Sequence, residues 1–470
     1  MSIEPDLEVE EEPRPSRVPD KEAARTEAVA PRRNFVRDVF SVLVARVLTK
    51  ALQFAIGVVA ARLVGPEGRG LIASFSVAPE LAITFSQLGV RQAVAYHIGK
   101  KIYSVHELVP TLFGLALTSN LTAVVACLIY YYFTGLLNQD LSLIILALAP
   151  IPFALLSNYI SGVLLGKEMI VRFNRITWIP MALNLILVIS VGWIGGTGVF
   201  GIMLAGFIAT VLSAGYAIWL MRSIAPIRIG FNGEIARKLT RLGIIYAGSL
   251  FLLTLNYRLP ILLLQAFSSL HEVGIYTVGQ TLAYIIWEIP ALVSNLLFAR
   301  GVNSTDQAAF SEKVFQLTRL VILAGSVVAI GCAILGPFII PLVYGEEFRR
   351  SAEVLTILLP GTVAFMAFKL VHMDIAGRGR PWLAMVVVGP CILANTAVGW
   401  LLIDDLGAEG AAAITSAAYV VAAVAYVIIY ARVCRKPIMS IITYRKSDFV
   451  MLKERMMQAL HREPRGAKKS

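Results

Sequence analysis

Four basic side chains lie inside long apolar stretches of the sequence, where a charge is costly. Arg46 and Lys50 are one helical turn apart in ARVLTKALQF, and Arg258 and Lys369 lie in two later apolar stretches. A cation at the centre of a membrane helix costs roughly 2.5–3.5 kcal/mol on insertion scales, so it must face protein or water, and it usually marks a transport pathway. Arg46 and Lys50 repel each other unless an anion lies opposite. A multi-oxygen anion such as a pyrophosphate meets this need, because Arg binds it through several charge-assisted hydrogen bonds.

Three acidic residues in the apolar stretches are the candidate anions, namely Glu80, Glu288 and Asp374. They leave two interpretations of the buried charges open. In the first, cations and anions form internal salt bridges that lock helices together. In the second, the four cations line a central, water-filled, net-cationic cavity that binds an anionic substrate, and the acidic residues couple transport to an ion or pair with the cations. The repeat described below favours the cavity.

The composition decides which elements position these residues. The chain has 470 residues, of which 57% are hydrophobic and only 15% charged, and its mean hydropathy is +0.73. Runs of about 20 apolar residues, each long enough to cross a bilayer as a helix, recur along the chain. Every backbone polar group must be satisfied within a segment in lipid, so the sequence predicts an all-α polytopic membrane protein. We expect twelve transmembrane helices, near 39–61, 71–97, 108–134, 141–164, 176–195, 198–221, 242–266, 274–299, 314–344, 354–376, 382–403 and 410–431.

The loops between these helices predict the orientation in the cytoplasmic membrane. Lys and Arg are concentrated in every second loop and in the C-terminal tail, so both termini are expected to be cytoplasmic. The net charge of +12 then indicates contact with anionic phospholipids rather than with nucleic acid. Residues 1–31 are acidic and contain proline, which predicts a disordered tail, and no cleavable signal peptide is recognised. Residues 432–470 form a basic tail, for which a helix lying on the membrane and a solvated tail remain alternatives.

The chain also repeats itself at a nearly constant offset. Three glycine blocks align at about 209 to 211 residues: Gly65 and Gly70 with Gly274 and Gly279, Gly166 with Gly377, and Gly198 and Gly201 with Gly407 and Gly410. Two charged pairs follow the same repeat at 208 residues, because Lys50 corresponds to Arg258 and Glu80 to Glu288. We therefore expect two pseudo-symmetric six-helix lobes, 32–221 and 242–431, joined by a basic linker at 222–241.

Three segments resemble a known family. LVGPEGRG at 63–70, LVYGEEFRRSAEVLTILLP at 342–360 and GAEGAAAITSAAYVV at 407–421 are similar to the polysaccharide-exporter branch of the MOP exporter superfamily, which includes the Wzx-type flippases of lipid-linked oligosaccharides. The resemblance covers about 33–435. It implies a cationic cavity with alternating access and an undecaprenyl-pyrophosphate-linked oligosaccharide as cargo, with a proton or sodium ion as candidate coupling ion. It also implies that Arg46, Lys50 and Arg258 line the cavity, whereas Lys369 is included only because of its depth.

Two alternative functions were weighed against this one. A cation-coupled multidrug extruder of the same fold would need an acidic cavity, which the four buried cations disfavour. A membrane glycan polymerase or ligase would need a sizeable outer loop, and the predicted outer loops are short. His97, His106, His271 and His372 show no partner spacing, and the four cysteines show no metal-ligand spacing. The sequence therefore predicts a transporter rather than an enzyme, without a cofactor or a metal.

Overall fold

The computed structural model describes residues 35–291, 307–378, 380 and 382–443, and these residues contain helices and no strand. In chain order, the helices are α1 (Phe35–Ser86), α2 (Val90–Gly99), α3 (Val105–Phe133), η2 (Leu136–Asn138), α4 (Leu141–Leu148), α5 (Pro150–Gly166), α6 (Ile170–Leu187), η3 (Val188–Ile194), α7 (Gly198–Arg222), α8 (Gly233–Phe267), α9 (Leu270–Ile285), α11 (Gln307–Tyr344), η4 (Glu346–Phe348), α12 (Ser351–Gly377), α13 (Leu383–Cys434) and α14 (Met439–Ile442). Nine helices in this described part are long and apolar enough to cross a membrane.

The outer surface of the helices is strongly apolar. Large side chains such as Phe133, Ile194 and Phe338 are more than 70% exposed. A soluble monomer rarely exposes so much contiguous apolar surface, whereas lipid covers it at no cost. The prediction of an all-α polytopic membrane protein is confirmed.

Two helices contain two crossings each. Both α1 and α13 have 52 residues, and at 1.5 Å per residue such a helix is roughly 78 Å long, more than twice the thickness of a hydrocarbon core of about 30 Å. Each bends at one glycine, Gly65 (φ 63°) in α1 and Gly407 (φ 56°) in α13. Between the first two predicted crossings and between the last two, the chain thus bends at a single glycine instead of passing through a loop of several residues. A positive φ at glycine turns the chain within a single residue, so the following residues already begin the next helix.

The remaining predicted crossings correspond to the other helices, some of which are interrupted. The second crossing continues from α1 into α2 after a left-handed turn at Leu88 and Gly89. The fourth comprises α4 and α5, and the fifth ends in η3, which is a π-helical segment. The eighth begins as α9, and its continuation beyond residue 291 lies outside the described residues.

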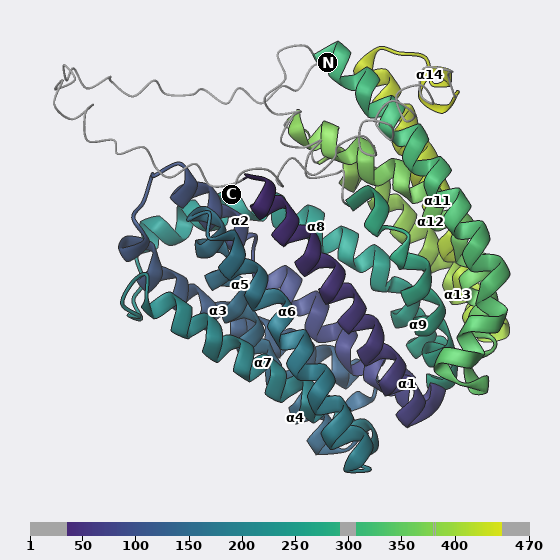
Figure 1. Ribbon diagram of the computed structural model, residues 1–470, viewed down its shortest axis with the longest axis horizontal. Coiled ribbons are helices and arrows are strands. Elements are labelled where there is room, and N and C mark those ends of the chain that lie inside the picture. Colours follow the sequence, from purple (N-terminus) through teal and green to yellow (C-terminus); the bar gives the residue numbers. More distant parts are fainter. Residues whose placement is uncertain (1–34, 292–306, 379, 381, 444–470) are drawn as a thin grey trace, which may run out of the picture.

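The helices form two bundles, which we call the N-terminal bundle (α1–α7) and the C-terminal bundle (α8–α13). Figure 1 shows them on the left and right, with α1 and α9 between them. In the C-terminal bundle α12 packs against α9, α11 and α13, and in the N-terminal bundle α1, α5 and α6 pack against α7. The bundles meet where α1 contacts α8 and α9 and where α2 contacts α8. Residues brought to this contact come from both halves of the sequence.

The backbone follows two of the three glycine correspondences. Gly198 at the start of α7 and Gly407 at the kink of α13 both have a φ of 56°, and Gly166 and Gly377 are the last residues of α5 and α12. The first correspondence is wrong. Gly65 is a kink residue, whereas Gly274 lies within α9, where its backbone contacts Pro66 while Gly70 contacts Leu270. These reciprocal contacts make Gly70, not Gly65, the counterpart of Gly274.

The segments outside the two bundles are only partly described. The predicted linker at 222–241 is shorter than expected, because α7 ends at Arg222 and α8 begins at Gly233. The side chain of Asn232 accepts hydrogen bonds from the N–H groups of Glu234 and Ile235 and so caps α8. The predicted disordered tail at 1–31 lies outside the described residues, as does most of the basic tail at 432–470.

Candidate functional site

A first group of charges joins α1 to the segment that follows α9. Arg46 and Lys50 lie on one face of α1, and both contact Glu288: Nε of Arg46 is 2.7 Å from one carboxylate oxygen and Nζ of Lys50 is 3.3 Å from the other. Arg46 also donates a hydrogen bond of 3.4 Å to the carbonyl of Ala291. We call Arg46, Lys50 and Glu288 the Glu288 cluster. Its side chains are 28% to 51% exposed, so the cluster remains accessible to a ligand.

A second group joins the other crossing of α1 to α8. Nη2 of Arg258 lies 2.7 Å and 2.9 Å from the two carboxylate oxygens of Glu80. Arg69 lines the same cavity, which has a volume of about 160 Å³. We call Glu80, Arg258 and Arg69 the Glu80 cluster. The hydroxyls of Ser76, Thr277 and Thr281 and the amide of Gln280 also line this cavity.

Arg69 is a site residue that the sequence analysis missed. It lies between the predicted crossings at 39–61 and 71–97, but the kink at Gly65 places it in the first turns of the second crossing. Its buried Nε has no hydrogen-bond partner among the described residues. A guanidinium without its full set of acceptors is costly inside a protein, and an anion in the cavity would supply them. The signal in the sequence was its spacing from Ser76 and Glu80, which places all three on one helix face.

The two clusters are related by the internal repeat. Lys50 and Arg258 are 208 residues apart, as are Glu80 and Glu288, and in both pairs the cation of one bundle contacts the carboxylate of the other. The salt-bridge interpretation is therefore correct in that these cations are paired. Each cluster nevertheless contains two cations for one carboxylate among the residues that the structure describes. Among the described residues, each of these two clusters therefore has one cation in excess of its carboxylate.

Lys369 is not part of either cluster. Its ammonium lies over the rings of Trp287, Tyr257 and Phe365, at 4.1, 4.9 and 5.9 Å from their centroids. It also donates a hydrogen bond of 3.1 Å to the hydroxyl of Tyr257. The ring faces carry partial negative charge, so this aromatic cage compensates the cation inside the C-terminal bundle. Trp287 and Tyr257 of this cage directly precede Glu288 and Arg258 in the sequence.

Asp374 is also separate from the clusters. Its side chain is fully buried, and one carboxylate oxygen accepts hydrogen bonds from Arg378 at 2.8 and 3.1 Å and from the hydroxyl of Tyr430 at 2.5 Å. The other carboxylate oxygen has no partner in the described part of the chain. The structure therefore places Asp374 in an ion pair of the C-terminal bundle and not at the interface between the bundles.

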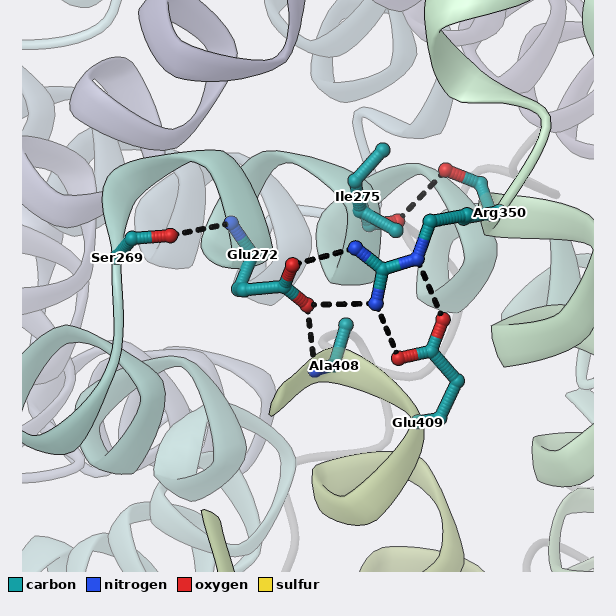
Figure 2. A network of polar contacts seen from close by, with 7 residues as sticks. Ser269, Glu272, Ile275, Arg350, Ala408 and Glu409 are labelled. Atoms are coloured by element: carbon teal, nitrogen blue, oxygen red, sulfur yellow. Dashed lines mark hydrogen bonds and ion pairs between the residues drawn. The ribbon is translucent and has the colours of Figure 1, made fainter. Parts of the chain in front are cut away.

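A further network, which the sequence did not predict, connects the first turn of α9, the residue before α12 and the kink of α13 (Figure 2). The guanidinium of Arg350, just before α12, contacts Glu272 of α9 at 2.5 Å and Glu409 of α13 at 2.6 Å. Glu272 also accepts the N–H of Ala408 at 2.8 Å, next to the kink of α13. The guanidinium of Arg350 thus donates hydrogen bonds to both carboxylates at once. The network fixes the C-terminal bundle where α13 bends.

Comparison with known proteins identifies the family to which this chain is similar. The model of the polysaccharide biosynthesis protein family matches residues 59–353, which is more than half of the chain. A comparison with curated proteins gives no match.

Several solved structures have the same fold. An inward-facing multidrug resistance MATE family transporter of the MOP superfamily is 17% identical, with a TM-score of 0.63 over 82% of this chain and 94% of its own. The lipid II flippase MurJ in an inward closed conformation is 13% identical, with a TM-score of 0.68 over 90% and 93%. A MOP superfamily transporter from Pyrococcus furiosus, described as having a binding pocket of reverse polarity, is 16% identical, with a TM-score of 0.61 over 85% and 95%.

These matches confirm the resemblance to the polysaccharide exporters of the MOP superfamily. The family match rests on sequence, and the structural matches show that the arrangement of helices is the one found in these transporters. The chain therefore belongs to the polysaccharide biosynthesis protein family and has the fold of the MOP superfamily transporters.

Proposed function

We propose that this membrane transporter is a flippase that moves a polyprenyl-pyrophosphate-linked oligosaccharide, of the undecaprenyl type, across the cytoplasmic membrane. The observation that carries the proposal is the pair of repeat-related clusters between the bundles, each with two cations for one carboxylate. A pyrophosphate diester carries two negative charges at neutral pH, and the two clusters together have two cations in excess. The polyprenyl chain would remain in lipid, and the glycan would pass between the bundles.

In the proposed mechanism, the cations of the two clusters first form ion pairs with the carboxylates and then bind the pyrophosphate. Without cargo, Glu80 and Glu288 hold Arg46, Lys50 and Arg258, whereas Nε of Arg69 has no partner among the described residues. When the pyrophosphate enters, its oxygens replace the carboxylates on Arg46, Lys50 and Arg258, because an Arg fork binds phosphate through parallel hydrogen bonds. The released carboxylates are then available to a proton or sodium ion, and alternating access carries the anion across.

The proposal also covers the orientation of the termini, the absence of an enzymatic step and the role of Lys369. Both termini are proposed to be cytoplasmic, because Lys and Arg are concentrated on that side. The matched families are transporters, and we propose no enzymatic step. Lys369 is proposed as an additional cation that attracts the pyrophosphate, and its side chain is partly exposed.

A cation-coupled multidrug extruder is the second candidate function. The structural similarity to the multidrug resistance transporter favours it, as do the two carboxylates at the interface. The net charge of the clusters disfavours it, since a cationic drug would meet four cations and two carboxylates. The Pyrococcus furiosus transporter, with its pocket of reverse polarity, is similar to this chain in fold, so the fold by itself does not decide between the two.

Binding to the purified protein separates these functions. We expect undecaprenyl pyrophosphate to bind more tightly than undecaprenyl monophosphate, and the cation tetraphenylphosphonium not to bind. Arg258→Ala should weaken binding of the pyrophosphate roughly tenfold or more, because a charge-assisted hydrogen bond to an anion contributes about 1.5–3 kcal/mol. Lys100→Ala is the matched control, because Lys100 is exposed in a loop far from the clusters along the chain, and should leave binding unchanged.

Neutralising the carboxylates gives results of opposite sign for the two functions. Glu80→Gln and Glu288→Gln remove the competing anion, so each should tighten the binding of undecaprenyl pyrophosphate in a flippase. In an extruder the same variants would abolish binding of tetraphenylphosphonium. Binding of this cation by the wild-type protein, together with its loss in the Gln variants, would exclude the proposed function.

A further inference from the structure

The two bundles touch through bare backbone at one end of their contact. A Cβ atom at Gly70 would lie 1.8 Å from the carbonyl oxygen of Leu270, and one at Gly274 would lie 1.9 Å from that of Pro66. The two contacts are reciprocal, because a carbonyl of α9 lies over Gly70 of α1 and a carbonyl of α1 lies over Gly274 of α9. We call these four residues the Gly70 crossing. No side chain larger than a hydrogen atom fits between the two helices at this point.

A second contact of the same kind occurs at the opposite end of the second crossing. A Cβ atom at Gly243 of α8 would lie 2.0 Å from the carbonyl oxygen of Leu88, and one at Gly89 would lie 2.2 Å from that of Gly243. We call these three residues the Gly243 crossing. About one turn before Gly89 on α1, the ring of Phe85 contacts that of Phe251 on α8, at 5.3 Å between centroids.

The charged residues lie between these two crossings. Glu80 is ten residues after Gly70 and nine before Gly89, which places it roughly 14–15 Å from either crossing at 1.5 Å per residue. Arg258 is fifteen residues after Gly243 on the facing helix. The structure therefore holds the Glu80 cluster between two places at which the bundles are in backbone contact.

Additional contacts reinforce one crossing more than the other. Near the Gly70 crossing, Arg62 of α1 donates hydrogen bonds to the carbonyls of Val343, at 2.6 Å, and of Leu342 at the end of α11. The ring of Phe54 also contacts that of Tyr344 there, at 6.0 Å. Because a helix leaves its last carbonyls without intrahelical partners, Arg62 satisfies groups of the other bundle.

We propose that the Gly70 and Gly243 crossings are the two gates of the transporter and that they open in turn. Contacts made only of Cα–H groups and carbonyls hold helices closely but weakly, so they form and separate without interlocked side chains. The Gly70 gate would face the outer side and the Gly243 gate the cytoplasm. This inference rests on the proposed transport function and adds the residues that regulate access to its site.

The test uses alanine variants with matched controls. Gly70→Ala, Gly274→Ala and Gly243→Ala add one methyl group within a helix at a crossing. Gly206→Ala in α7 and Gly331→Ala in α11 add the same group where nothing lies within 4 Å of it. Gly89 is not used, because its φ of 62° would strain an alanine for a separate reason.

The readout is the accessibility of the cavity and requires no cargo. Ser76→Cys, in a chain in which the four native cysteines are replaced, provides one thiol in the cavity. A membrane-impermeant maleimide is applied to right-side-out and to inverted vesicles. We expect Gly70→Ala and Gly274→Ala to raise labelling several-fold from the outer side, and Gly243→Ala to raise it several-fold from the cytoplasmic side, while the two controls match the parent.

Three results would overturn the proposal: crossing variants that label like the controls, variants of both crossings that raise labelling from the same side, or variants that lower labelling from both sides.

If the alanine variants do not reach the membrane, Phe85→Cys with Phe251→Cys replaces them. A short bifunctional maleimide across these positions should block cytoplasmic labelling of Ser76→Cys and leave outer labelling intact; unchanged cytoplasmic labelling would refute the gate. Because labelling is independent of cargo, failure to bind undecaprenyl pyrophosphate would refute the proposed function and not the gates.

Discussion

At the scale of single residues, this protein accommodates charge inside apolar helices in three ways. Arg46, Lys50 and Arg258 pair with carboxylates of the opposite bundle. Lys369 lies in an aromatic cage. Asp374 pairs with Arg378 one turn further along α12. Each solution lowers the cost of burying a charge, and the first also connects the two bundles.

The pairing of Asp374 with Arg378 predicts the stability of its variants. Asp374→Ala should lower the free energy of unfolding by about 3 kcal/mol, because removing one partner of a buried ion pair leaves the other uncompensated. The double variant Asp374→Leu with Arg378→Met should recover most of this loss. Thermal unfolding of the purified proteins in detergent measures both effects.

The same variants separate pairing from ion coupling. A double variant that regains stability and also transports would assign Asp374 to structure alone. One that regains stability but transports no undecaprenyl pyrophosphate into the opposite leaflet of proteoliposomes would assign it to coupling. A single variant as stable as the wild-type protein would contradict the ion-pair role.

At the scale of elements, glycine kinks replace loops, and a charged network holds one of them. The kink of α13 at Gly407 is adjacent to Ala408, whose N–H binds Glu272, and to Glu409, which binds Arg350. A kink leaves backbone groups without helical partners, and this network supplies some of them. The bend of α13 is therefore fixed by residues of α9 and of the segment before α12.

Removing the central guanidinium tests the importance of this network. Arg350→Ala should lower the free energy of unfolding by about 1–2 kcal/mol, because two carboxylates lose a shared partner, although solvent screens a residue that is partly exposed. Arg349→Ala is the neighbouring control. Arg349 pairs only with Glu346, both side chains are more than 60% exposed, and such a pair contributes about 0–1 kcal/mol. Equal unfolding temperatures of the two variants would contradict a special role of Arg350.

At the scale of the whole molecule, the internal repeat explains why the ion pairs connect the two bundles. Each bundle carries a cation on its first crossing, Lys50 or Arg258, and a carboxylate on its second, Glu80 or Glu288, and the corresponding residues are 208 apart. In the docked bundles, the first crossing of one faces the second crossing of the other. Each cation therefore meets the carboxylate of the opposite bundle, and the contact between bundles is made twice.

Exchanging the charges of one pair tests this arrangement. Arg258→Glu places two carboxylates face to face and Glu80→Arg adds another cation, so each single variant should lose on the order of 1 kcal/mol of stability. The double variant restores opposite charges across the interface and should recover the unfolding temperature. A double variant less stable than either single variant would show that the pair does not connect the bundles in this way.

The sequence alone determined the class of the protein and the position of its charges along the chain. Hydropathy is a local property, so the crossings follow from the order of the residues, and the resemblance to polysaccharide exporters is confirmed. The charged pairs Lys50 with Arg258 and Glu80 with Glu288 were also identified by spacing. Binding of substrate by Arg46, Lys50, Arg258 and Lys369 stays a prediction.

Only the tertiary structure decided which of these residues meet. Gly70 and Gly274 correspond at 204 residues, whereas Glu80 and Glu288 correspond at 208, because the second half carries four more residues, about one helical turn, between its glycine and its carboxylate. An alignment at one constant sequence offset ignores such an insertion, so it pairs Gly274 with Gly65 instead of Gly70. Arg69, the Arg350 network and the two crossings depend on how the bundles dock and where single glycines bend the chain. Contacts between residues far apart in the sequence leave no local pattern, so they become visible only when the bundles are assembled.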